Sequence, residues 1–118
     1  MKKRTLNQTW TLCLRMWKWI KKVWQTEGYK GMSVHKLKYI WLADNGFDST
    51  TISAHCFFCD YKDGAGYCHV NCPAAMVDPE FDCADSSYDY ETNPVEFYRE
   101  LLRLNRIRKA KAKEVVNG

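Results

Sequence analysis

The chain lacks any long apolar run, and this shortage argues against a membrane-spanning helix. Its 118 residues contain no stretch that approaches the ~18 consecutive apolar positions that a span needs. The basic N-terminus is not followed by the apolar segment of a signal peptide. Arg15 and Lys18 interrupt the only candidate, and no small-residue cleavage site comes after it. We therefore expect a reducing compartment, where spaced cysteines are more often metal ligands than disulfides.

Signatures of catalysis are missing as well. The combination of His-x-Glu with Pro-Cys-x-x-Cys that marks zinc deaminases is absent. No βαβ pattern surrounds the one C-x2-C motif, as a thioredoxin-like redox centre would require. A nucleophile that pairs Cys56 with His55, or Cys68 with His69, would need neighbours in sequence to face each other, which they seldom do. We expect that the protein is not an enzyme.

Acidic residues are almost absent from the first 40 residues, so the charge of the chain is segregated. Residues 1–40 hold ten Lys and Arg against one acid, Glu27, which gives a net charge of +9. Residues 41–98 carry −10 and residues 99–118 carry +5, although the overall charge is only +4. Either the acidic middle pairs internally with the basic ends, or the two signs form separate faces, one for a polyanion and one for a basic partner.

Cysteine, in contrast, is plentiful and spaced. Cys56 and Cys59 form a C-x2-C pair, and Cys68 and Cys72 form a second pair with three residues between them. The intervening Asp63-Gly64-Ala65-Gly66 is a turn signal that lets the two pairs face each other. Four thiolates from two short loops suit the tetrahedral, closed shell of structural Zn²⁺. We predict zinc as the cofactor, with disulfides, a redox pair and unligated thiols as the alternatives.

Other residues compete for the fourth ligand position, which the spacing assigns to Cys68. Cys83 is the main rival, although it would have to return across the turn that begins at Pro79. His55 and His69 each adjoin a cysteine, and adjacent residues rarely both bind one metal. Both are therefore expected to be solvated or to support a ligand by hydrogen bonding.

Helical periodicity precedes and follows the cysteine pairs. Residues 6–26 carry an apolar stripe at alternating steps of four and three, with Asn7 or Thr9 as a possible cap. The members of this stripe are Leu6, Trp10, Cys13, Trp17, Ile20 and Trp24, widened by Leu14, Met16, Trp19 and Val23. Cys13 belongs to this stripe, far from the cysteine pairs, and is predicted to be a packed thiol rather than a ligand.

Two further helices carry their own start and stop signals. Ser33 predicts the start of a helix over residues 34–44, with Val34, Leu37, Ile40 and Trp41 inward, and Asn45-Gly46 stops it. Asn93-Pro94-Val95-Glu96 combines a cap, a proline at the first position and an acid in the first turn. Residues 73–92 are expected to be irregular, because two prolines bar a long helix there.

The predicted fold is therefore mainly α: one small domain over residues 1–118, in which helices flank a loop-rich zinc-knuckle module. Two helices occupy 6–44, the cysteine module occupies 55–83, and the C-terminal helix occupies 93–113. A hydrophobic content of 46% and an aromatic content of 14% exclude wholesale disorder.

Four tryptophans lie beside the Lys and Arg residues of the first helix. Such a helix can lie on a membrane surface or stack on nucleic-acid bases, but the simplest interpretation is that these rings form the core. The second helix has Lys36 and Lys38 but no Arg or Gln, so sequence-specific reading of DNA is not supported.

The cysteine module resembles small cysteine-rich proteins encoded by bacteriophages. The similar positions are Trp17 and Trp19 in a Trp-rich helix, Cys56 and Cys59 followed by Asp60-Tyr61, Cys72-Pro73, and the later Cys83. This chain differs in having Asp60 where Glu is usual and one extra residue between Cys68 and Cys72. The resemblance implies a zinc-stabilised phage accessory protein in the cytoplasm of a bacterial host cell.

Two functions follow as expectations. The first is a protein-binding module that inhibits or redirects a host or defence protein, since aromatic residues dominate interface hot spots. The alternative is non-specific nucleic-acid binding by the basic terminal helices.

Overall fold

The computed structural model describes residues 4–26, 32–48, 52, 57–58, 72–81 and 87–117, with side chains up to residue 111. Its main elements are α1 (Leu6–Trp24), α2 (Val34–Asp44), α5 (Pro73–Val77) and α6 (Pro94–Asn117). No strand occurs within these ranges. The mainly helical class is thus confirmed, whereas most of the predicted knuckle module (55–83) lies outside the described residues.

The start of α1 is fixed by a capping box rather than by the predicted caps. The hydroxyl of Thr5 accepts a hydrogen bond from the Gln8 N–H at 3.1 Å, and the Gln8 side chain accepts one from the Thr5 N–H at 2.9 Å. The prediction of Asn7 or Thr9 as the cap is therefore wrong. The Thr9 hydroxyl instead donates to the Thr5 carbonyl at 2.9 Å, inside the helix.

The boundaries of α2 and the start of α6 agree with the sequence signals. Ser33 accepts a hydrogen bond from the Lys36 N–H at 3.2 Å. The chain leaves α2 at Asn45 and turns at Gly46, whose φ of +80° is a conformation that glycine adopts without strain. At α6, the Phe97 N–H donates to the Asn93 carbonyl at 2.9 Å, and Pro94 takes the first helical position.

Two local predictions are corrected. Pro73 begins the short helix α5 in a stretch that was expected to be irregular, because proline suits the first position of a helix. On α2, Val34, Leu37 and Trp41 are buried as predicted, but Ile40 is only half-buried and Lys38 is buried as well. The Lys38 ammonium lies 5.0 Å from the Tyr90 ring centre and 5.8 Å from that of Trp17, so aromatic faces stabilise its charge.

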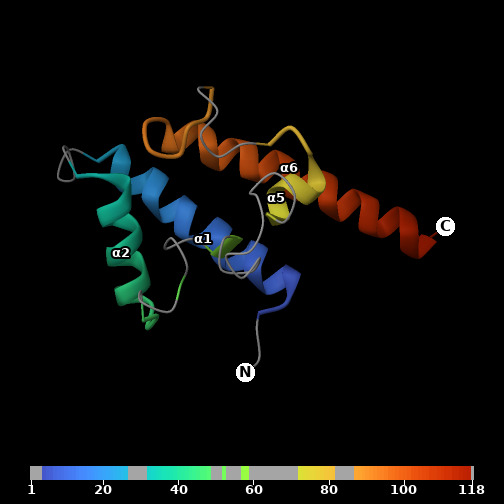
Figure 1. The fold of residues 1–118 in the computed structure, drawn as a ribbon, viewed down its shortest axis with the longest axis horizontal. Helices are drawn as coiled ribbons and strands as arrows, with labels where there is room; N and C mark the ends of the chain where they lie inside the picture. The colour runs from blue at the N-terminus through green and yellow to red at the C-terminus, as the bar shows by residue number, and fades with distance from the viewer. Residues whose placement is uncertain are drawn as a thin grey trace.

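α1 is the central element, and both α2 and α6 pack on it (Figure 1). α1 and α6 run side by side in opposite directions, since Asn7 bonds to Arg108 near one end while Lys21 lies over Tyr98 near the other. α5 packs on α6. The chain before and after the cysteine module is thus gathered around one helix.

The tryptophans form much of the core. Trp10, Trp17 and Trp41 are buried, and Trp17 meets Phe97 edge to face at 4.7 Å. The core interpretation is thus confirmed for Trp10 and Trp17 of α1, Trp19 is half-buried, and Trp41 faces inward from α2 as predicted. Trp24 departs from the predicted stripe, because its side chain is 37% exposed at the end of α1, while Met16 and Val23 are buried.

Candidate functional site

The predicted zinc ligands fall largely beyond the described residues. Cys56, Cys59 and Cys68 lie outside them, as do the alternatives Cys83, His55 and His69. Cys72 is described: it is buried and caps the start of α5. Within the ranges that the structure describes, no three His, Cys, Asp or Glu residues are grouped so as to hold a metal. Zinc ligation therefore stays a prediction.

The residues between the first two predicted ligands are anchored in the core. Phe57 and Phe58 are both buried. The ring of Phe58 lies 4.8 Å from Trp10 on α1, and that of Phe57 lies 5.9 Å from Trp41 on α2. Such aromatic contacts add to the stabilisation from buried area. Phe57 and Phe58 therefore attach this point of the chain to both helices.

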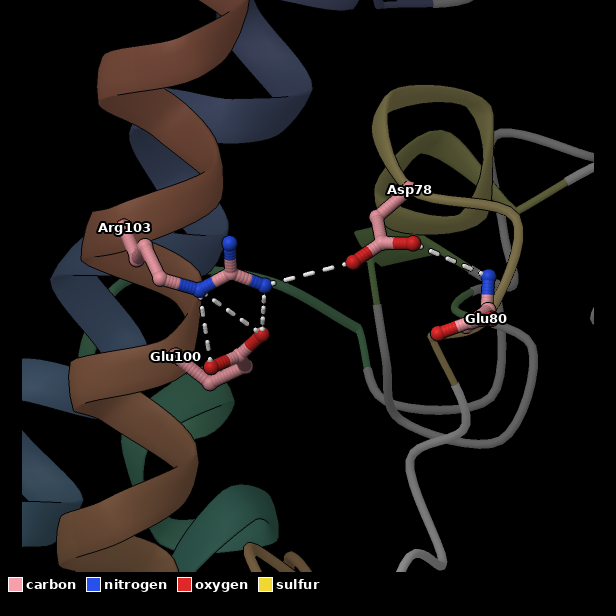
Figure 2. A network of polar contacts seen from close by, with 4 residues as sticks. All are labelled: Asp78, Glu80, Glu100 and Arg103. Carbon is pink, nitrogen blue, oxygen red and sulfur yellow. Dashed lines mark hydrogen bonds and ion pairs between the residues drawn. The ribbon is translucent and has the colours of Figure 1, made fainter.

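A polar network attaches the other side of the cysteine module to α6. Figure 2 shows Arg103 between two carboxylates: Glu100 on the same helix and Asp78 just after α5, at 3.3 Å. The second oxygen of Asp78 accepts a hydrogen bond from the Glu80 N–H at 3.0 Å. The hydrogen bond to Glu100 is the main cause that raises the pKa of Arg103 above its usual range. The charge of this arginine is therefore used within the fold.

A groove of about 240 Å³ between α1 and α6 is lined by four cationic side chains. Arg15 and Lys18 come from α1, and Arg108 and Lys109 come from α6. The other lining residues are neutral: Trp10, Thr11, Leu14, Tyr98, Leu102 and Asn105. No Asp or Glu is among the described residues that form this α1–α6 groove, so the charges of its described lining are all positive.

Arg108 is held rigidly at one end of the groove. Its guanidinium lies 5.0 Å from the ring centre of Trp10. Nη1 donates to Oδ1 of Asn7 at 2.6 Å, and Nη2 donates to Oδ1 of Asn105 at 2.9 Å. Both acceptors are neutral, and desolvation by burial lowers the pKa of Arg108 from its usual value. The described partners of this guanidinium are thus all uncharged.

Among the described residues, the internal charge pairing that the sequence suggested is clearest on α6. α6 is tied to the acidic middle of the chain through Arg103 and Asp78. In α1, none of the four cations forms an ion pair with a carboxylate of the described residues. Among the described residues, the positive charge of α1 therefore has no carboxylate partner.

The groove was not predicted from the sequence, although one of its contacts joins two residues that are close together in the chain. Asn105 and Arg108 are three residues apart on one helix, a spacing at which side chains meet. The contact between Asn7 and Arg108 joins residues 101 positions apart. It depends on the register of α1 against α6, which periodicity does not determine.

The described residues define a small, mainly helical protein with a cationic groove between two antiparallel helices. No model of a known protein family matches the chain, and no curated protein or solved structure is significantly similar to it. None of the helices in the described ranges combines the length and the apolar character needed to cross a membrane.

Proposed function

We propose that the protein binds nucleic acid non-specifically, through phosphate contacts in the α1–α6 groove. The observation that supports this is the convergence of four cations from two helices on one groove whose described lining contains no acid. Contacts between Lys or Arg and phosphates supply most of the affinity of non-specific complexes. A groove with neutral and apolar walls between its cations suits a phosphate backbone.

The same groove offers little for reading a base sequence. Apart from its cations, Asn105 and Thr11 are its polar side chains suited to base edges, and Asn105 is already bonded to Arg108. We therefore expect affinities in the range of non-specific binding, with a Kd on the order of 10⁻⁴ to 10⁻⁶ M at physiological salt.

Structural zinc is part of the proposal as a stabiliser of the fold. Cys56, Cys59, Cys68 and Cys72 would hold it, and four thiolates leave no open position for chemistry. Buried residues at Phe57–Phe58 and at Pro73–Ala75 support this role, since they attach the flanks of the module to the core.

The cellular setting rests on the resemblance to cysteine-rich phage proteins. It supports an accessory protein in the cytoplasm of a bacterial host cell. A host or defence protein as the partner remains a prediction from the sequence. The aromatic excess that favoured it is now accounted for mainly by the core, where Trp10, Trp17 and Trp41 are buried.

The experiment is a salt titration of binding to fluorescently labelled single-stranded and duplex DNA, read by anisotropy. We expect micromolar binding at low salt that weakens steeply as salt rises, because each phosphate contact releases a counterion. Absence of binding at low salt would contradict the proposal. So would binding to anionic vesicles without binding to DNA, since it would point to a membrane surface.

A matched pair of variants locates the contact. Lys18→Glu reverses a charge within the groove, whereas Lys36→Glu reverses one at an exposed position on α2. We expect the first to weaken DNA binding strongly and the second to leave it nearly unchanged. Equal losses in both variants would mean that net charge, and not the groove, carries the binding.

A further inference from the structure

We infer that Arg108 binds one phosphate group of the nucleic acid directly, as an ordered site within the α1–α6 groove. This inference rests on the proposed function but goes further than it. Non-specific attraction needs only a positive surface, whereas an ordered site needs a cation whose donors are already in position. The two claims therefore make different predictions for a substitution that keeps the charge.

The orientation of the guanidinium supports this inference. Trp10 covers it at 5.0 Å, and the side-chain oxygens of Asn7 and Asn105 fix its two Nη atoms at 2.6 and 2.9 Å. Each Nη carries two N–H groups, so one on each nitrogen has no acceptor among the described residues. A guanidinium is planar, and two of its N–H donors can bind two oxygens of one phosphate.

Arg108 has no carboxylate partner among the described residues. Arg103 lies five positions earlier on the same helix and is satisfied by Glu100 and Asp78. Arg108 has only neutral oxygens and a ring as partners in the described part of the chain. A partly buried charge without a counter-ion is costly, and an incoming phosphate would supply one.

The surroundings of the open donors support the inference as well. Lys109 adjoins Arg108 on α6, and Arg15 faces the groove from α1. Their charges add to the field at the groove, which attracts an anion without competing for the fork of Arg108. Lysine and arginine at these positions also tolerate variation in the path of the strand, which suits non-specific binding.

The decisive variant keeps the charge and removes the fork. Arg108→Lys should weaken binding of a short single-stranded oligonucleotide by about tenfold, the cost of losing a bidentate, charge-assisted contact. Arg106→Lys is the matched control, because Arg106 is an exposed arginine of the same helix outside the groove. The affinity of this variant for the oligonucleotide should equal that of the wild type. Equal affinity in Arg108→Lys and wild type would overturn the inference and leave the proposed function intact.

A second pair covers the case in which Arg108→Lys disturbs the packing of Trp10. Asn105→Asp places a carboxylate 2.9 Å from Nη2 of Arg108, so it should compensate the charge internally and weaken oligonucleotide binding at least tenfold. Asn93→Asp changes the net charge equally at the start of α6, where Asp is a good cap. Equal effects of the two variants would overturn the ordered site.

Binding of inorganic phosphate tests the Arg108 site without DNA. Titration of phosphate into the ¹⁵N-labelled wild-type protein, followed through the indole N–H signal of Trp10, should give a saturable shift that Arg108→Lys reduces. A wild type that binds phosphate in this way but not DNA would support the site and contradict the proposed function. An indole signal that does not respond to phosphate would overturn the site.

Discussion

Two arginines of α6 show how differently the two halves of one helix are used. Arg103 belongs to the anchoring half (Pro94–Leu104), where Glu100 and Asp78 neutralise it. Arg108 belongs to the cationic half (Asn105–Lys111), where two asparagine oxygens and the ring of Trp10 hold it. Carboxylate partners neutralise the charge of an arginine within the fold. Neutral partners order the side chain and keep its charge available for an anion.

The same division applies to burial. The anchoring half carries Phe97, Leu101 and Leu104, all buried against the core, and it contacts α5 and α1. The described side chains of the cationic half are half-buried or exposed. We therefore expect substitutions in the first half to change stability, and substitutions in the second half to change binding.

The largest effect is expected from the cysteine module to which the anchoring half is tied. Cys59→Ser should release zinc and lower the free energy of unfolding by several kcal/mol, because metal binding and folding are coupled in such modules. Elemental analysis with native mass spectrometry gives the metal per chain. Cys13→Ser is the control: this cysteine is buried within α1, and its loss should leave the zinc content unchanged. Equal metal content in Cys59→Ser and wild type would refute the ligand assignment.

A core substitution tests the anchoring half directly. Leu101 is fully buried, so Leu101→Ala should lower the free energy of unfolding by about 2–5 kcal/mol. Leu102 is half-buried at the wall of the groove, so Leu102→Ala should lower the free energy of unfolding by less. Urea denaturation followed by circular dichroism measures both. A larger loss for Leu102→Ala would reverse the assignment of the two faces of α6.

A single charge tests the cationic half. Lys109→Gln should weaken binding of single-stranded DNA about fivefold near 0.1 M salt and reduce the slope of log K against log salt by about 0.7, the loss of one phosphate contact. The free energy of unfolding of this variant should hardly change, because Lys109 is exposed. An unchanged slope would show that this side chain does not contact phosphate.

The smallest effect is expected at the exposed end of the Arg103 network. Asp78→Asn removes one of two carboxylates from a partly exposed arginine, so it should lower the free energy of unfolding by less than about 1 kcal/mol. DNA affinity should stay the same. A clear gain or loss of affinity in this variant would break the separation between the two halves.

Features set by neighbouring residues were readable from the sequence. The cap at Ser33, the stop at Asn45-Gly46 and the start of α6 at Pro94 are confirmed, because each depends on a few adjacent residues. The capping box at Thr5 is equally local. It joins Thr5 to Gln8, one turn ahead of the predicted caps Asn7 and Thr9.

Features that depend on tertiary contacts could not be predicted from the sequence. Lys38 is buried because Trp17 and Tyr90 come together around it, and no periodicity indicates this. The contact between Asn7 and Arg108 likewise requires the register of two helices from opposite ends of the chain. The predicted zinc ligands follow from spacing alone, and of these the structure describes only Cys72.

The most direct test of the central claim is a map of backbone amide shifts in the full ¹⁵N-labelled protein as a short single-stranded oligonucleotide is added. The account predicts that the shifts concentrate on Thr11, Arg15 and Lys18 of α1 and on residues 105–109 of α6. Shifts confined to α2 or to the anchoring half of α6, or no shifts at low salt, would contradict it.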